Sequence, residues 1–379
     1  MSLGSAQQAH HAIFKDGLQF ACESGSNVLA LGVDLKHALS LKQGNQIYLS
    51  KLLGDLNNPE VYAHTKTCLD TMKSLDAVAC DLHPDLHSTI LAIQLSERLN
   101  IPLIQVQHHH AHLAAVMVEY GLNQPVIGLA MDGFGYGTDG TAWGGECLYV
   151  NSDVSGTTCE RVGYLKSVPM PGGDAASREP WRMAVAWLED EQLSAQLFPT
   201  LAVATVSNLC KSELTPLTSS MGRLFDAASA ILLGNTYAAF EGEAAIKLEQ
   251  AAHGKLDASA LPFKSKGGVI DMSEALHELA VRRLAGDEKP ELAASFHATV
   301  ANAFATLAKE KTTEKGGDDV ILAGGCFLNQ ILETRIITSL ESSGLKVWKS
   351  EQVARGDGGI SLGQLWVACY ELERRILCV

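Results

Sequence analysis

Val126-Ile-Gly-Leu-Ala-Met-Asp-Gly133 decides the fold class of this chain, because it is an apolar run that ends in an Asp-Gly pair. We expect it to form a buried strand, followed by a glycine-rich turn and a return strand over Glu146-Cys-Leu-Tyr-Val150. Val28-Leu-Ala-Leu-Gly-Val-Asp-Leu-Lys36 has the same form, an apolar strand that runs into a Gly/Asp turn. Two halves that open alike suggest a duplicated α/β architecture with a ligand in the cleft between the halves.

Around these two segments, short apolar runs alternate with stretches of helical spacing. Strands are expected over 38–41 and 46–50, joined as a hairpin by Gln43-Gly-Asn45, and over 77–80, 102–107 and 319–323. Helices are expected over 58–75, 88–99, 110–120, 180–249 (several), 293–311 and 362–376. Residues 254–290 show little pattern.

Composition excludes several classes of protein and of partner. The chain has 379 residues, of which 46% are hydrophobic, so disorder is excluded and more than one domain is expected. No apolar run reaches the roughly 18–20 residues of a membrane-spanning helix. The nine cysteines include no C-x-x-C pair, which fits reduced thiols, and we expect a cytoplasmic protein. The net charge of −14 would repel a polyanion, so nucleic acid is not an expected partner. Because no apolar run is long enough to span a membrane, a membrane is not an expected partner either.

Gln107-His-His-His-Ala-His112 is the sharpest chemical signal. His108 and His112 stand four residues apart, so on a helix they share one face and can bind one metal ion. Asp132 and Asp357 each follow an apolar strand or lie in a glycine-rich turn, and could add oxygen ligands. Two histidines with carboxylates suit iron, zinc or manganese. The alternatives are a hydrogen-bonded, polar helix start for the histidines and a structural turn for either aspartate.

Two glycine-rich segments suggest a nucleotide cleft. Asp132-Gly-Phe-Gly-Tyr-Gly137 and Ala323-Gly-Gly-Cys-Phe-Leu-Asn329 both follow a strand, as phosphate-binding loops do, although neither is a Walker or Rossmann motif. Asp226 or Glu243 could hydrogen-bond a ribose or base, and helix capping explains either one equally well. Tight turns need glycine in any case, so each segment alone is weak evidence.

Pro171-Gly-Gly-Asp174, followed by Arg178 and Arg182, forms a third cluster. Two arginines beside a glycine-rich turn can hold a phosphate or a carboxylate. The alternative is a helix start that carries surface arginines. Cys326 is the best-placed thiol, but we do not expect it to act as a nucleophile.

Taken together, seven strings resemble the C-terminal half of the HypF family, the carbamoyltransferases of nickel–iron hydrogenase maturation. The resemblance runs in order from about Val28 to about Ala368. The strings are Asp81-Leu-His-Pro84, Val106-Gln-His-His-His-Ala-His112, Asp132-Gly-Phe-Gly-Tyr-Gly-x-Asp-Gly-Thr-x-Trp-Gly-Gly-Glu146, Pro171-Gly-Gly-Asp174, Ser219-Ser-Met-Gly-Arg-Leu-Phe-Asp226, Gly324-Gly-Cys-Phe-Leu-Asn329 and Gly356-Asp-Gly-Gly359.

The resemblance implies an α/β fold of two duplicated ribonuclease-H-like lobes, of the acetate-kinase, sugar-kinase, heat-shock and actin type. The first lobe would span 28–125 and be completed by a C-terminal helix over 358–376, and the second would span 126–357. Nucleotide and a divalent metal, iron or zinc, would lie in the interlobe cleft. The implied catalytic and metal-binding residues are His108, His112, Asp132 and Asp357. The implied nucleotide-binding residues are Gly133, Gly135, Gly137, Asp226, Glu243, Gly324, Gly325 and Asn329.

By the same resemblance, the chain would move a carbamoyl group from carbamoyl adenylate to the C-terminal cysteine thiol of HypE. The product would later supply the cyanide ligands of the hydrogenase iron. Family members carry acylphosphatase, zinc-finger and adenylate-forming modules before this region, and here these would be supplied elsewhere. An excised domain and a shortened relative both fit.

Three alternatives stay open. One is an O-carbamoyltransferase that acts on a small-molecule hydroxyl, as NodU-like relatives do. A second is a tRNA-modifying partner subunit similar to the threonylcarbamoyl transferases, which the net charge disfavours. The third is a nucleotide-binding scaffold without catalytic activity.

Overall fold

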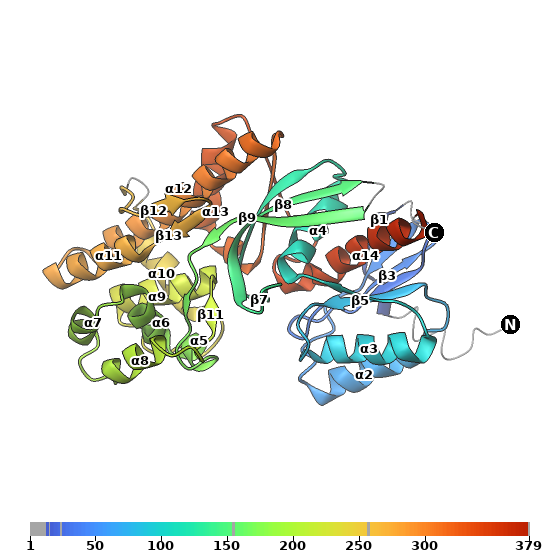
Figure 1. Ribbon diagram of the computed structural model, residues 1–379, viewed down its shortest axis with the longest axis horizontal. Coiled ribbons are helices and arrows are strands. Elements are labelled where there is room, and N and C mark those ends of the chain that lie inside the picture. Colours follow the sequence, from blue (N-terminus) through green and yellow to red (C-terminus); the bar gives the residue numbers. More distant parts are fainter. Residues whose placement is uncertain (1–12, 15, 23–24, 154–155, 256–257, 378–379) are drawn as a thin grey trace.

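The chain forms two mixed sheets with helices between and around them, as Figure 1 shows for a computed structural model that describes residues 13–14, 16–22, 25–153, 156–255 and 258–377. The first sheet has six strands in the order β1-β4-β3-β2-β5-β6. Its strands are β1 (Leu18–Ala21), β2 (Val28–Ala30), β3 (Ser40–Gln43), β4 (Gln46–Leu49), β5 (Ala77–Asp81) and β6 (Leu103–Val106). The hairpin predicted for β3 and β4 is confirmed, whereas β1 is an edge strand that the pattern does not predict.

The second sheet has nine strands and repeats the topology of the first. The order β9-β8-β7-β14-β15 corresponds to β4-β3-β2-β5-β6, with an antiparallel meander on one side of the central strand and parallel strands on the other. The expected duplication is therefore confirmed. Its strands are β7 (Val126–Tyr136), β8 (Ala142–Asp153), β9 (Gly156–Leu165), β10 (Val168–Pro169), β11 (Leu217–Thr218), β12 (Lys264–Lys266), β13 (Val269–Asp271), β14 (Asp319–Ala323) and β15 (Lys346–Lys349).

Two helices, α4 (His108–Tyr120) and α14 (Ile360–Leu377), pack against each other between the two sheets (Figure 1). α4 contacts β7, β8 and β14 of the second sheet, while α14 contacts β2, β3, β5 and β6 of the first. The two helices, and strands from both sheets, belong to one buried apolar cluster. This shared core brings the start of α4 next to the short helix η2 (Asp357–Gly359) that leads into α14.

The outer faces of both sheets are covered by further helices. α3 (His87–Leu99) packs on β5 and contacts α2 (Pro59–Asp70). α9 (Met221–Leu233) and α12 (Lys289–Lys315) cover β7, and a large apolar core joins them to their neighbours. The remaining helices are α5 (Ala175–Arg178), α6 (Pro180–Leu188), α7 (Glu191–Leu197), α8 (Val203–Cys210), α10 (Glu243–Ala252), α11 (Ser273–Ala285), α13 (Gln330–Glu341) and the 3-10 turn η1 (Gly325–Leu328).

The structure differs from the sequence prediction at three places that matter. α4 begins at His108, two residues before the predicted start, because the side chain of Gln107 accepts the backbone N–H of His110 and caps the helix. The predicted turn directly after Gly133 is wrong: β7 continues to Tyr136 through a register shift after Met131. The stretch 254–290, which shows little pattern, contains β12, β13 and α11.

Candidate metal centre

The first turn of α4 presents His108 and His112 on one face, as the four-residue spacing predicts. Both side chains are buried, and their ring centroids lie 4.9 Å apart. Asp132, from the bend in β7, and Asp357, from η2, face the same point. One ligand atom from each of the four residues lies within 4.8 Å of the others. The structure thus brings together all four residues that the sequence nominates for a metal ion.

Distances within the cluster show which atoms converge. Oδ2 of Asp132 lies 2.8 Å from Nε2 of His112 and 3.5 Å from Nε2 of His108. Oδ1 of Asp357 lies 3.6 and 3.7 Å from the same two nitrogens. The other oxygen of Asp132 accepts the backbone N–H groups of Gly133, at 2.7 Å, and Gly325, at 3.3 Å. These bonds orient one carboxylate oxygen toward the imidazoles.

Asp81 also belongs to the centre, although the sequence alone assigns no role to this residue. It ends β5, is 1% exposed, and its Oδ2 lies 2.9 Å from Nδ1 of His108. β5 and β6 are adjacent parallel strands, and α4 follows β6 directly. Because the carboxyl ends of parallel strands meet at one edge of a sheet, a polar residue that ends β5 is the signal that could have placed Asp81 beside α4.

The electrostatics of the cluster fit a cation. Burial disfavours a charged imidazole, yet Asp132, Asp357 and Asp81 together raise the pKa of His108 well above its ordinary value. Nε2 of His108 is buried and has no hydrogen-bond partner among the described residues. Two imidazole nitrogens and two carboxylate oxygens form a donor set that divalent iron, zinc or manganese accepts. The residues present therefore fit a divalent metal.

A cavity of about 210 Å³ opens beside Asp132 and Asp357. Four of the residues predicted to bind nucleotide line it: Gly133, Asp226, Gly325 and Asn329. Both apolar and charged side chains line it. The apolar residues are Ala245, Ile246 and Leu328, and the charged ones that the sequence analysis gives no role are Lys36, Arg223, Glu241 and Glu249.

The side chains of Asp226 and Asn329 are held by protein partners. Nε of Arg223 lies 2.7 Å from Oδ2 of Asp226. Oδ1 of Asn329 accepts the backbone N–H of Leu332, and its Nδ2 donates to Nε2 of His297 at 2.9 Å. These partners therefore hold both side chains in place in the cavity wall before any ligand binds.

The other four predicted nucleotide-binding residues lie outside this cavity. Gly135 packs so closely on the histidines that an added Cβ would lie 2.4 Å from Cε1 of His109. Gly137 packs on the Trp143 indole. Gly324, at φ +102°, lies against a β7 carbonyl, and Glu243 pairs with Lys247 in α10. The structure gives these residues contacts within the fold.

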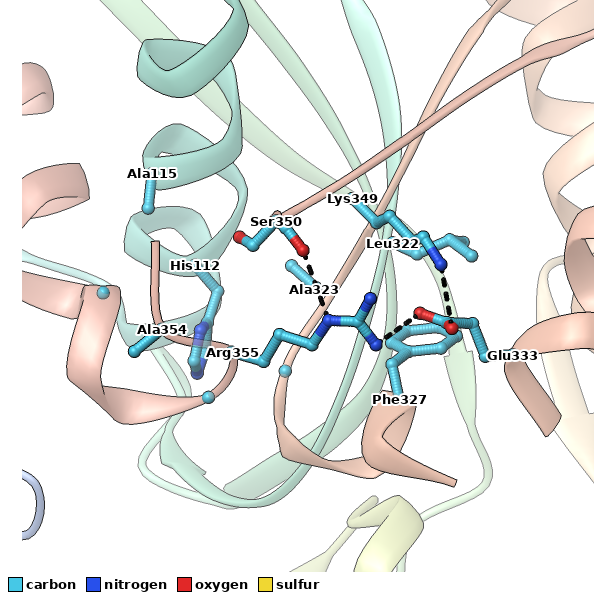
Figure 2. A pocket seen from close by; sticks show the side chains of 13 residues that line it. His112, Ala115, Leu322, Ala323, Phe327, Glu333, Lys349, Ser350, Ala354 and Arg355 are labelled. Atoms are coloured by element: carbon cyan, nitrogen blue, oxygen red, sulfur yellow. Dashed lines mark hydrogen bonds and ion pairs between the residues drawn. The ribbon is translucent and has the colours of Figure 1, made fainter. Parts of the chain in front are cut away.

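Figure 2 shows a second, smaller cavity, which His112 and Arg355 help to line. Arg355 and Lys349 both bind the carboxylate of Glu333, at 2.9 and 3.0 Å. The cavity measures about 20 Å³, which is room for little more than one water molecule. Because Arg355 stands two residues before Asp357, this ion-pair cluster holds the segment that carries Asp357.

The two arginines of the third predicted cluster have different contacts in the structure. Arg182 pairs with Glu179 at 2.6 Å, whereas Arg178 forms no ion pair with any residue that the structure describes. Burial, with Asp132 nearby, raises the pKa of the Cys326 thiol well above its ordinary value, which argues against a thiolate nucleophile.

Most of the chain matches the descriptions of two protein families. Its residues 128–364 match the family described as carbamoyltransferase, Kae1-like domain, second subdomain, and residues 23–119 match the HypF Kae1-like domain. The carbamoyltransferase HypF homolog of Cupriavidus necator is 41% identical, over 90% of this chain and 91% of that protein. Carbamoyltransferase HypF2 of the same organism is 39% identical, over 91% of this chain and 47% of that protein.

Two solved structures share the fold. Full-length HypF in its phosphate- and nucleotide-bound form matches with a TM-score of 0.86 and 32% identity, over 94% of this chain and 48% of that one. HypF of T. kodakarensis matches equally well, with 31% identity over 94% of this chain and 50% of that one. The chain thus spans about half the length of HypF2 and of these two proteins. Within the part of the chain that the structure describes, no helix has both the length and the apolar character needed to cross a membrane.

Proposed function

Because the chain belongs to the HypF family of carbamoyltransferases, we propose that it transfers a carbamoyl group from carbamoyl adenylate to a thiol of an acceptor protein. The acceptor is the C-terminal cysteine of a HypE-like protein, and the product serves cyanide-ligand synthesis in nickel–iron hydrogenase maturation. Acylphosphatase and adenylate-forming activities come from other modules. The described cysteines form no disulfide, which supports a cytoplasmic site for the reaction.

One observation carries the proposal. His108, His112, Asp132 and Asp357 come from three distant segments and converge beside a cavity that the predicted nucleotide-binding residues partly line. A divalent metal bound by these four residues would polarise the carbamoyl carbonyl or the phosphate as a Lewis acid. This arrangement of a cation site next to a nucleotide-sized cavity favours an acyl adenylate as substrate over a scaffold that only binds nucleotide.

The chain's own groups position the donor. The apolar side chains of Ala245, Ile246 and Leu328 pack on the adenine, and Asp226, fixed by Arg223, accepts a ribose hydroxyl. The N–H groups of Gly133 and Gly325 point at the Asp132 carboxylate, so they fix that side chain rather than the substrate. The donor phosphate would lie at the Asp132 end of the cavity, next to the four residues that would hold the metal ion.

The transfer needs no nucleophile from the enzyme. The acceptor sulfur, as its thiolate, forms a bond to the carbamoyl carbon, and the bond from that carbon to the phosphate oxygen breaks. AMP leaves with the bonding electron pair, and the thiol proton passes to solvent. A bound acceptor that covers the open cavity would keep out competing water, which would otherwise hydrolyse the mixed anhydride.

The test is a two-substrate assay with the purified, metal-loaded chain. Carbamoyl adenylate and a HypE-like acceptor are supplied, and mass spectrometry follows the gain of one carbamoyl group on the acceptor cysteine. An acceptor with its last cysteine replaced by serine is the control and gains nothing. Transfer to hydroxylated small molecules but not to the protein thiol would overturn the proposed acceptor in favour of O-carbamoylation.

A further inference from the structure

A third cavity, of about 410 Å³, adjoins the nucleotide-sized one. The two cavities share Gly133, Arg223 and Glu241, so they meet next to the Asp132 carboxylate. A transfer between two substrates needs two binding sites that meet at the reacting atoms. The nucleotide-sized cavity takes the donor, and the larger one is then open to the acceptor.

Three large apolar side chains in the walls of this larger cavity are exposed. Leu35, Phe134 and Phe240 line it with 46%, 45% and 59% of their surface exposed. They come from the loop after β2, the bend of β7 and the segment before α10, so the chain gathers them from three distant places. Clustered exposed apolar side chains beside a polar site mark a surface that binds a partner.

Of the two arginines that line this cavity, one has its guanidinium already bound and the other forms no ion pair with a described residue. Arg223 is bound by Asp226 and by the Ser177 hydroxyl. Asp174 and Arg178 lie one helical turn apart, at the two ends of α5, yet form no ion pair. Arg178 is exposed and forms no ion pair among the described residues, while Glu241 lies at the boundary with the nucleotide-sized cavity.

We propose that this cavity binds the C-terminal segment of the acceptor polypeptide, with its terminal carboxylate on Arg178. The inference rests on the proposed function and names the substrate class that its second site accepts. Arginine binds a carboxylate through two parallel hydrogen bonds, and the apolar walls take the side chains that precede the last residue. A thiol on the last residue would then reach past Gly133 toward the donor.

Asp174 and Glu241 shape this specificity. Both are acidic and line the cavity, so they repel acidic side chains of a bound peptide. The cavity therefore favours a peptide whose side chains are uncharged over an acidic one. A small hydroxylated acceptor would leave the exposed apolar walls uncovered.

The test measures peptide binding directly, by calorimetry on the full chain. The probe is N-acetyl-Ala-Val-Leu-Cys with a free C-terminal carboxylate, compared with the same peptide as its amide. We expect the acid to bind at least about tenfold more tightly than the amide, because the amide cannot make the charge-assisted, bidentate contact with Arg178. Arg178→Met removes this preference, and Phe240→Ser weakens both peptides alike.

Lys211→Met and Leu214→Ser are matched controls, because both residues are exposed and neither lines the cavity. Equal affinity for acid and amide in the wild type, or an acid preference that survives Arg178→Met, would overturn the inference. Because binding is read without turnover, a chain that binds the acid peptide but transfers no carbamoyl group contradicts the proposed function and leaves this site standing.

Discussion

The Asp81 carboxylate lies 2.9 Å from Nδ1 of His108, and this contact turns the opposite nitrogen of the ring toward Asp132 and Asp357. In metal sites, a carboxylate that accepts the second N–H of a histidine ligand fixes its tautomer and raises its basicity. Asp81 ends a strand of the first sheet, whereas Asp132 lies on the second. The centre therefore depends on both sheets holding their relative positions.

Replacing Asp81 by asparagine should weaken metal binding without removing a ligand. We expect metal affinity to fall by about 10–100-fold, the usual effect of losing such a supporting carboxylate. Titration with a competing chelator measures this change, and Asp85→Asn, at an exposed position of the following loop, should leave the affinity unchanged. Unaltered affinity in Asp81→Asn would show that the contact has no part in metal binding.

Replacing His112 by alanine should remove bound metal altogether, because one of two nitrogen ligands is lost from the set. We expect the metal content of the purified protein, measured by plasma mass spectrometry, to fall from about one ion per chain to near zero. His64→Ala, at an exposed site on α2, should keep its metal. Full metal content in His112→Ala would rule out the four-residue centre.

Replacing Gly135 by alanine should disturb the centre from outside the ligand set. A Cβ at this position would lie 2.4 Å from His109 and 2.8 Å from Cδ2 of His108, so the imidazoles must shift. Overpacking of this kind costs about 1–3 kcal/mol of unfolding free energy. Denaturant unfolding measures it, and Gly317→Ala, whose Cβ meets nothing within 4 Å, should be close to neutral. Equal stability of the two variants would contradict the packing.

His297 should make the unfolding free energy depend on pH. Burial lowers its pKa from 6.5 to about 4, so the unfolded chain binds the proton more tightly than the folded chain does. Stability is therefore fully present above about pH 6.5 and lost as the pH falls toward 4. The loss approaches about 3 kcal/mol for this residue. Protonation would also turn Nε2 into a donor and break its bond from Asn329.

Denaturant unfolding at several pH values tests this dependence. His297→Gln should flatten the slope between pH 6.5 and 4, whereas His277→Gln, at an exposed position on α11, should leave the slope as it is. An unchanged slope in His297→Gln would mean that the folded protein accepts the proton at this site.

Local pattern was enough to predict much of the fold. The apolar runs before Asp132 and Asp34 predict the central strands of two similar sheets, and the spacing of His108 and His112 predicts one face of a helix. Both signals depend only on residues close in sequence, through strand alternation and the helical repeat. Where a tertiary contact competes with a local signal, prediction was poorer: glycines 133 to 137 indicate a turn, yet pairing with β8 extends the strand to Tyr136.

The sequence by itself determined which residues could hold a metal ion, because ligand chemistry is a property of side-chain type. Only the tertiary structure decided that Asp81 supports His108, that Gly135 packs on the histidines, and that Glu243 lies outside the cavity. These outcomes depend on how two sheets and the α4–α14 pair pack together. Packing of this kind joins residues from separate elements of the chain, and no local pattern encodes the distance between them in the fold.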